Sequence, residues 1–174
     1  MAAELWQVYV TDFKFIIMPR LKVLEYLQHY VAGTLTPDME TNMKYPTAIS
    51  QTLAINITEI AYGTATVAIN ADAVIHGNQQ GTVHGGLICE LADAAIGTAH
   101  STLMEEGQSF TTIELKINFY RPVWHSTLRA IAKPLQRGKT ITHYLCEIKN
   151  DEDKIVATAT STVMTLYNEQ AKGR

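Results

Sequence analysis

Two carboxylates, and a histidine followed by two glycines, lie within residues 78–97, NQQGTVHGGLICELADAAIG. The apolar residues of this segment predict a long helix over about residues 84–103. Glycines at its start would leave backbone N–H groups open at the positive end of the helix dipole, where they can polarise a carbonyl. A carboxylate can activate water or attack directly. Because Asp and Glu are almost never fully buried without a partner, either one face of this helix is wet or a carboxylate lies there for chemistry.

The composition is that of one globular domain. The chain has 174 residues, 47% of them hydrophobic, and a net charge of −3 that argues against a dedicated nucleic-acid-binding protein. Its two cysteines, Cys89 and Cys146, are isolated and predict neither a disulfide nor a metal-binding pair. Glu4 and Asp12 fall where a signal peptide needs positive charge and then an apolar run, and no apolar run approaches the roughly eighteen residues of a membrane span. We therefore expect a soluble cytoplasmic protein without a membrane partner.

Periodicity predicts the elements that position the long helix. A first helix is expected over residues 20–32, with Pro19 in its first turn, Gly33 as its stop, and an apolar stripe of Leu21, Leu24, Leu27 and Val31. Residues 34–46 have turn formers and no periodicity, which indicates a loop. Residues 52–70 alternate as a hairpin with its turn at Tyr62–Gly63. Four further strands are predicted after the long helix, over residues 110–122, 127–136, 142–150 and 155–167.

This order of elements favours an α+β fold with an antiparallel sheet and the helix on one of its faces. The apolar residues of the long helix cover more of its circumference than a single stripe, so we expect it to lie in the core with the sheet curled around it. The small residues Ala94, Ala95, Gly97 and Ala99 would allow close packing.

A family resemblance covers about residues 50–167. The segments IHGNQQ, GTVHGGLICELADAAIGTA and TTIELKINFYRPV resemble the hotdog-fold acyl-CoA thioesterases of the PaaI type. The shared pattern is His-Gly-Gly with an Asn six residues before the His and an acidic residue nine after it, here Asn78, His84 and Asp93. The chain departs from the pattern at Gln79, where the family often has Pro, and at Glu90, where small or hydroxyl residues are usual.

The resemblance implies a sheet wrapped around one long helix, side-by-side pairing of subunits, and hydrolysis of an acyl- or aryl-CoA thioester to the free acid and CoA. No cofactor is implied beyond the coenzyme A of the substrate. We accordingly expect a helical extension and loop over residues 1–46, the hotdog domain over 47–168, and a tail over 169–174.

The resemblance also implies roles for single residues. Gly85 is the expected backbone donor to the thioester carbonyl, with the Asn78 amide as its helper. The resemblance favours Asp93 as general base or nucleophile, and Thr112 would orient the attacking water. Glu90, one turn earlier on a similar face, is the competing carboxylate; we expect it at the rim with the substrate-binding residues, with a direct role as the alternative.

The histidines receive smaller roles. His84 is expected to shape the loop by hydrogen bonding and, with Gly86, to contact the substrate. His76 and His100 have no metal-ligand pattern around them and are expected to be non-catalytic.

Helix geometry constrains how these residues can work together. Gly85 and Asp93 are eight residues apart, which is about 12 Å along one helix. One carbonyl cannot be hydrogen-bonded to Gly85 while it is also within reach of Asp93. Either Asp93 is not catalytic, or it serves a site whose Gly85 belongs to a second subunit. The second possibility requires a two-fold homodimer with antiparallel helices. A tetramer of such dimers is also expected.

Positive charge gathers in one part of the sequence. No Asp or Glu falls between Leu115 and Cys146, whereas six basic residues do: Lys116, Arg121, Arg129, Lys133, Arg137 and Lys139. Coenzyme A is a polyanion, so Arg121 and the turn Arg137–Gly138–Lys139 are our candidates for contacts to its phosphates. A solvated basic strand face is the alternative, and RNA binding is less favoured because no exposed aromatic stacking pattern is evident.

Two other functions remain open on the same scaffold. One is a non-catalytic acyl-CoA-binding or sensor protein, against which the presence of Asp93 argues. The other is a dehydratase or hydratase, which would need a histidine paired with a carboxylate. His84 and Asp93 are about 13 Å apart along the helix, so that pairing too would form only across subunits. The sequence does not specify the acyl group.

Overall fold

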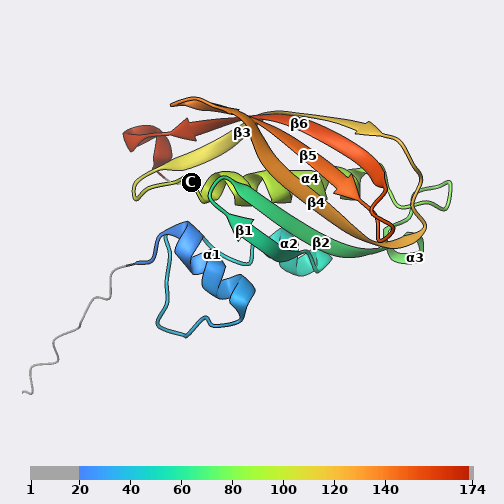
Figure 1. The fold of residues 1–174 in the computed structure, drawn as a ribbon, viewed down its shortest axis with the longest axis horizontal. Coiled ribbons are helices and arrows are strands. Elements are labelled where there is room, and N and C mark those ends of the chain that lie inside the picture. Colours follow the sequence, from blue (N-terminus) through green and yellow to red (C-terminus); the bar gives the residue numbers. More distant parts are fainter. Residues whose placement is uncertain (1–19, 173–174) are drawn as a thin grey trace, which may run out of the picture.

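The computed structural model describes residues 20–172 (Figure 1). Its helical elements are α1 (Val23–Ala32), α2 (Ala48–Leu53), α3 (Ala73–His76), α4 (Gly85–Ser101) and the 3₁₀ turn η1 (Asn168–Ala171). Its strands are β1 (Asn56–Ala61), β2 (Thr64–Asp72), β3 (Ser109–Phe119), β4 (His125–Arg137), β5 (Ile141–Lys149) and β6 (Ile155–Leu166). None of the helices in this described part is long and apolar enough to cross a membrane.

The six strands form one antiparallel sheet in the order β1-β2-β4-β5-β6-β3. The sheet curves over α4, which lies against its inner face (Figure 1). This confirms the predicted α+β architecture of an antiparallel sheet around one long helix. Because β3 is the last strand in the order, one of its edges has no strand partner among residues 20–172. That edge leaves a row of backbone donors and acceptors available for pairing.

Helix α4 is buried on one side and partly open on the other. Its sheet-facing residues are fully buried, among them Leu91, Ala92, Ala95 and Ile96. A second face, formed by Gly86, Glu90, Asp93 and Gly97, is half-buried or exposed. The prediction of a core helix is therefore confirmed for one side, and the two carboxylates lie on the other.

The N-terminal segment packs beside the sheet and the end of α4. Helix α1 lies against β1 and buries Val23 and Leu27, and it ends at Gly33, whose φ of 67° is the left-handed conformation expected of a helix stop. The hydroxyl of Tyr45 donates to Ser101 across 2.5 Å, which ties this segment to the last turn of α4.

Three local expectations were wrong or fall outside the described residues. Helix α1 begins at Val23, three residues later than predicted, and Pro19 lies outside the described range. Residue 53 belongs to helix α2 rather than to the first strand, because Thr47 caps that helix by accepting from the Ser50 N–H across 3.2 Å. The short helix α3 was not predicted; its cap is Asp72, which accepts from the Val74 N–H across 2.7 Å.

Candidate active site

The start of α4 presents one open backbone donor. His84 is the N-cap, and its Nδ1 atom accepts a hydrogen bond from the Gly86 N–H across 2.8 Å. The His84 carbonyl accepts from the Leu87 N–H across 3.0 Å. The N–H of Gly85 has no hydrogen-bond partner within residues 20–172. Gly85 therefore offers a free N–H at the positive end of a 17-residue helix.

A cavity of about 390 Å³ adjoins this donor. Its lining includes three of the candidate residues, Asn78, Gly85 and Arg121. The structure thus brings together residues from the 78–84 loop, the first turn of α4 and the chain after β3. Arg121 also donates through its guanidinium to the carbonyl of Ile155, which fixes part of its side chain.

The Asn78 side chain is engaged in its own loop. Its Oδ1 atom accepts from the backbone N–H groups of Gln80 and Thr82, across 2.9 and 3.2 Å. Its amide nitrogen donates to the Thr82 hydroxyl across 3.0 Å. An amide nitrogen carries two N–H groups, so only the second is free to reach a carbonyl in the cavity. Asn78 therefore holds the loop in shape, and this role is separate from any contact with a substrate carbonyl.

Asp93 and Thr112 form a second group, farther along α4. The Thr112 hydroxyl on β3 donates to the Asp93 carboxylate across 3.2 Å, and both side chains are half-buried. A carboxylate held by one hydroxyl donor keeps its other oxygen available for a proton. Glu90 lies one turn earlier on the same face. Burial, and then the neighbouring charge of Asp93, raises the pKa of the Glu90 carboxyl above its ordinary value.

Within one chain, the two groups do not meet. The eight residues between Gly85 and Asp93 are continuous helix, so their separation along the axis is about 12 Å. As the sequence already indicated, Gly85 and Asp93 of one chain are too far apart to serve one carbonyl, so a site that uses both residues needs two chains.

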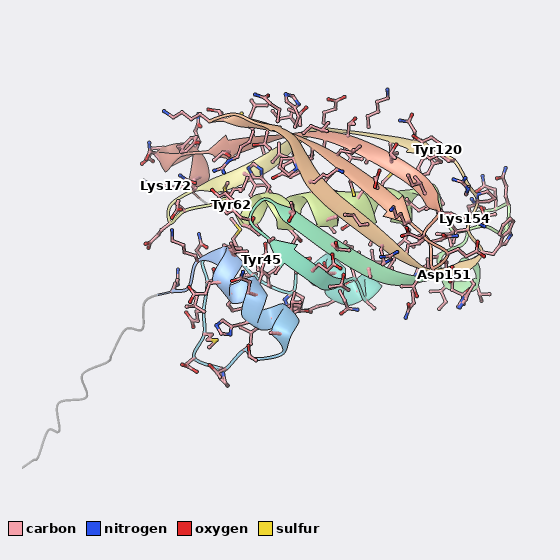
Figure 2. All side chains as sticks on the ribbon, viewed as in Figure 1. Tyr45, Tyr62, Tyr120, Asp151, Lys154 and Lys172 are labelled. Carbon is pink, nitrogen blue, oxygen red and sulfur yellow. The ribbon has the colours of Figure 1, made fainter. Side chains whose placement is uncertain are left out.

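The basic turn lies at the other end of the molecule. Arg137, Gly138 and Lys139 line a cavity of about 250 Å³, together with Leu103 just after α4. The Arg137 guanidinium is held over the Tyr62 ring, 5.0 Å from its centre. Gly85 and Leu103 are separated by about 27 Å at the helical rise per residue. In Figure 2, Tyr62, beside the basic turn, and Tyr120, beside the Gly85 cavity, lie toward opposite ends of the long axis.

A buried polar cluster behind this second cavity was not assigned a role from the sequence. His100 is fully buried in the last turn of α4; its Nε2 atom contacts the Thr165 hydroxyl at 3.0 Å and its Nδ1 atom the Tyr144 hydroxyl at 3.3 Å. Burial lowers the pKa of His100 to about 4, with a smaller contribution from the positive charge of Arg137. Its two hydrogen-bonding partners come from separate strands, β6 and β5, so no sequence spacing indicated the cluster.

Phe119 is a second residue without a predicted role. It ends β3, lines the Gly85 cavity and is 50% exposed. The segment INFYRP, which contains Phe119, carries part of the family resemblance, and this was the only indication in the sequence that Phe119 could lie near the site.

The part of the chain that the structure describes contains no group of three His, Cys, Asp or Glu side chains arranged to hold a metal ion. Cys89 is half-buried on α4 and Cys146 is buried in β5. His76 accepts through Nδ1 from the Asp72 N–H across 3.2 Å, a contact within its own loop.

Comparison with known proteins connects these features to a family. Residues 80–157 match the model of the Thioesterase superfamily. A Haemophilus influenzae relative is 28% identical over 86 residues, or 49% of this chain, and the chain spans only 62% of that relative's length. The medium/long-chain acyl-CoA thioesterase YigI of Salmonella typhimurium is 25% identical over 134 residues, which are 69% of this chain and 86% of that protein.

A solved structure extends the similarity to the fold. The Escherichia coli PaaI protein from the phenylacetic acid degradation operon matches with a TM-score of 0.68 and 25% identity, over 84% of this chain and 95% of that one. The resemblance to hotdog-fold thioesterases of the PaaI type and the predicted hotdog fold are both confirmed.

Proposed function

We propose that this chain, which shares the hotdog fold and sequence pattern of the thioesterase superfamily, hydrolyses acyl-CoA thioesters at sites shared between two subunits. The observation that carries the proposal is the open Gly85 N–H at the start of α4, in a cavity wide enough to hold part of a ligand. A thioester carbonyl bound there would gain most as its oxygen becomes negative, because a fixed donor and the helix dipole both favour that charge.

Asp93 supplies the other half of the reaction. Its carboxylate takes a proton from a water molecule that attacks the carbonyl carbon, or attacks that carbon itself, with Thr112 holding it in either case. When water attacks, the tetrahedral oxyanion collapses, the carbon–sulfur bond breaks, and the CoA thiolate takes up the proton held by Asp93, which leaves the free acid. When the carboxylate attacks, the same collapse releases CoA and leaves an anhydride between the acyl group and Asp93, which a water molecule then hydrolyses to the free acid, with its proton passing to the thiolate. The Asn78 amide, through its second N–H, assists Gly85.

Two features of the chain fit the required partner. The free edge of β3 is eleven residues long and exposes large apolar side chains, with Ile113 56% exposed and Phe119 50% exposed. Such an edge is a ready template for pairing with another chain. The half-open face of α4 carries small residues beside its carboxylates, which allows a second helix to approach. A second copy of this chain, related by a two-fold axis, would place Gly85 of one subunit level with Asp93 of the other.

The same symmetry gives the basic turn a place in the site. In an antiparallel pair, the reacting carbonyl lies beside Asp93 of one subunit. Leu103 of that same subunit is ten residues farther along the helix, which places it about 15 Å beyond the carbonyl. Arg137 and Lys139 of that subunit are then at the far end of the pantetheine arm, where the CoA phosphates lie. Arg121 and Gly138 line the same path, with His84, Gly86 and Glu90 nearer the reacting group.

The test is release of free thiol from a panel of linear, branched and aryl CoA esters, with the matching N-acetylcysteamine esters, which lack the nucleotide. We expect hydrolysis of at least one class of CoA ester, with a lower KM than for the ester that lacks phosphates. Medium and long linear chains belong in the panel because of the YigI relative, and aryl esters because of PaaI.

Three other results would contradict the proposal. Binding of CoA esters without turnover would make the chain a binding or sensor protein. Hydration of an enoyl-CoA would make it a hydratase, a reaction for which His84 is poorly placed because its Nδ1 already caps α4. Equal KM values with and without the nucleotide would remove the role of the basic turn.

A further inference from the structure

The ring of Phe119 is packed against Gly85. A Cβ atom added to Gly85 would lie 3.1 Å from Cζ of this ring and 3.4 Å from Cε1, closer than side chains normally approach. The contact exists because Gly85 has no side chain. The ring therefore lies within van der Waals distance of the residue whose N–H is open, and both line the same cavity of about 390 Å³.

The backbone on both sides of Phe119 is fixed. Phe119 pairs with Ala157 at the end of the β3–β6 ladder, and the next N–H, of Tyr120, donates to the Val156 carbonyl across 2.8 Å. The Tyr120 hydroxyl and that of Thr158 are 2.6 Å apart. These contacts fix the backbone that carries Phe119, and the contact with Gly85 places its ring at the wall of the cavity.

The lining of the cavity has apolar and polar members. Val83, Ile88 and Val123 are buried, and they are apolar like the ring of Phe119, whereas Asn78, Thr82 and Arg121 contribute polar side chains. The carbons attached to a thioester carbonyl are apolar, but the pantetheine arm carries two amides that need hydrogen bonds. An ester bound at Gly85 would therefore be expected to place its acyl carbons against apolar lining such as Phe119, and the amides of its pantetheine arm against the polar side chains.

We infer that Phe119 determines which acyl groups are hydrolysed, by limiting bulk on the first carbons beyond the thioester carbonyl. This inference rests on the proposed thioesterase function. A carbonyl held by the Gly85 N–H has its neighbouring carbons beside the ring. A linear chain passes along the ring face, whereas a methyl branch or an aryl ring on those carbons overlaps it. Phe119 is thus a specificity-determining residue that excludes branched and aryl esters in favour of linear ones.

The experiment compares Phe119→Ala with the unchanged protein on octanoyl-CoA, 2-methyloctanoyl-CoA and benzoyl-CoA. The readout is the ratio of kcat/KM for a bulky ester to that for octanoyl-CoA. A ratio within one protein sample is unaffected by the fraction of active molecules. We expect the ratio to rise about tenfold or more in Phe119→Ala, because a difference of one carbon in the fit of a substrate to an apolar pocket changes kcat/KM by about that factor. Phe119→Trp should lower the ratio.

A matched control is Leu135→Ala, which removes another large apolar side chain, 59% exposed on β4, without touching the cavity. Its ratio should equal that of the unchanged protein. If Phe119→Ala is unstable, Phe119→Leu gives the same test with a smaller expected rise. Hydrolysis by the unchanged protein with an unaltered ratio in the Phe119 variants overturns this inference alone. Absence of hydrolysis in the unchanged protein overturns it together with the proposed function.

Discussion

The hydroxyl of Thr112 donates to the carboxylate of Asp93 across 3.2 Å, which joins edge strand β3 to the middle of α4. The hydrogen bond leaves the second oxygen of Asp93 free on the partly open face of the helix. Glu90, the other carboxylate on that face, has no such partner among the hydrogen bonds of residues 20–172. The two carboxylates are therefore distinguishable by mutation.

Replacing Asp93 by Asn should abolish most turnover. The amide has nearly the same shape as the carboxylate but cannot take a proton, and loss of a general base costs about 10²-fold or more in kcat. We expect Glu90→Gln to keep most of the rate. Steady-state hydrolysis and CoA binding by calorimetry check both variants. Near-normal kcat in Asp93→Asn together with loss in Glu90→Gln would move the assignment to Glu90.

Replacing Thr112 by Val should lower kcat by about tenfold with little change in KM, because a hydrogen bond to a charged group is worth about 1.5–3 kcal/mol when it is lost. Thr112→Ser keeps the hydroxyl and should restore most of the rate. Adding Thr112→Val to Asp93→Asn should cost little more, since both changes remove the same interaction. An additive loss in the double variant would mean that Thr112 acts elsewhere.

Asn78 has two separable roles, in its loop and toward the carbonyl. Asn78→Asp keeps the oxygen that accepts from Gln80 and Thr82 but removes the N–H groups. Loss of a donor to the oxyanion costs about 3 kcal/mol in the chemical step. We expect Asn78→Asp to melt close to the unchanged protein and to lose kcat, and Asn78→Ala to lose both stability and kcat. Full activity in Asn78→Asp would leave Asn78 as a turn residue only.

His100 should make the free energy of unfolding depend on pH. Its pKa of about 4 in the fold lies below the ordinary value of 6.5, so the unfolded chain binds a proton first as pH falls. Its contribution to stability is present above pH 6.5 and is lost as pH falls from 6.5 to 4, and the loss amounts to about 2 kcal/mol at pH 5. Urea unfolding at pH 7.5 and 5 checks this. In His100→Gln the difference between the two pH values should shrink by about that amount; an unchanged difference would contradict the prediction.

Sequence reasoning predicted the features that repeat along the chain. Alternation and turn residues located the sheet strands, and the apolar residues around His84 and Asp93 located the long helix; the need for a second subunit, drawn from the spacing of Gly85 and Asp93, stays a prediction. It failed for α2 and α3, which depend on single capping contacts of Thr47 and Asp72 rather than on periodicity. It also missed the His100 cluster and the Phe119 contact, because their partners come from separate elements and meet only in the fold.

In the proposed dimer each site combines Gly85 of one chain with Asp93 of the other, and two inactive variants can test this arrangement. Gly85→Pro removes the open N–H at a helix position where proline is favoured. The preceding residue, His84, already has the extended ψ of 134° that proline requires. Gly85→Ala is the matched control, because it introduces the same Cβ contact with Phe119 but keeps the N–H. We expect Gly85→Pro to lose about 10²-fold or more in kcat and Gly85→Ala much less.

The decisive measurement mixes Gly85→Pro with Asp93→Asn in equal amounts, after each variant has been shown to fold and to exchange subunits. About half of the dimers formed by random pairing are mixed, and in a shared-site dimer each mixed pair has one intact site and one with both defects. A shared-site dimer should recover to about a quarter of the activity of the unchanged protein. Activity that stays at the level of the separate variants after complete exchange would show that each site is built from one chain.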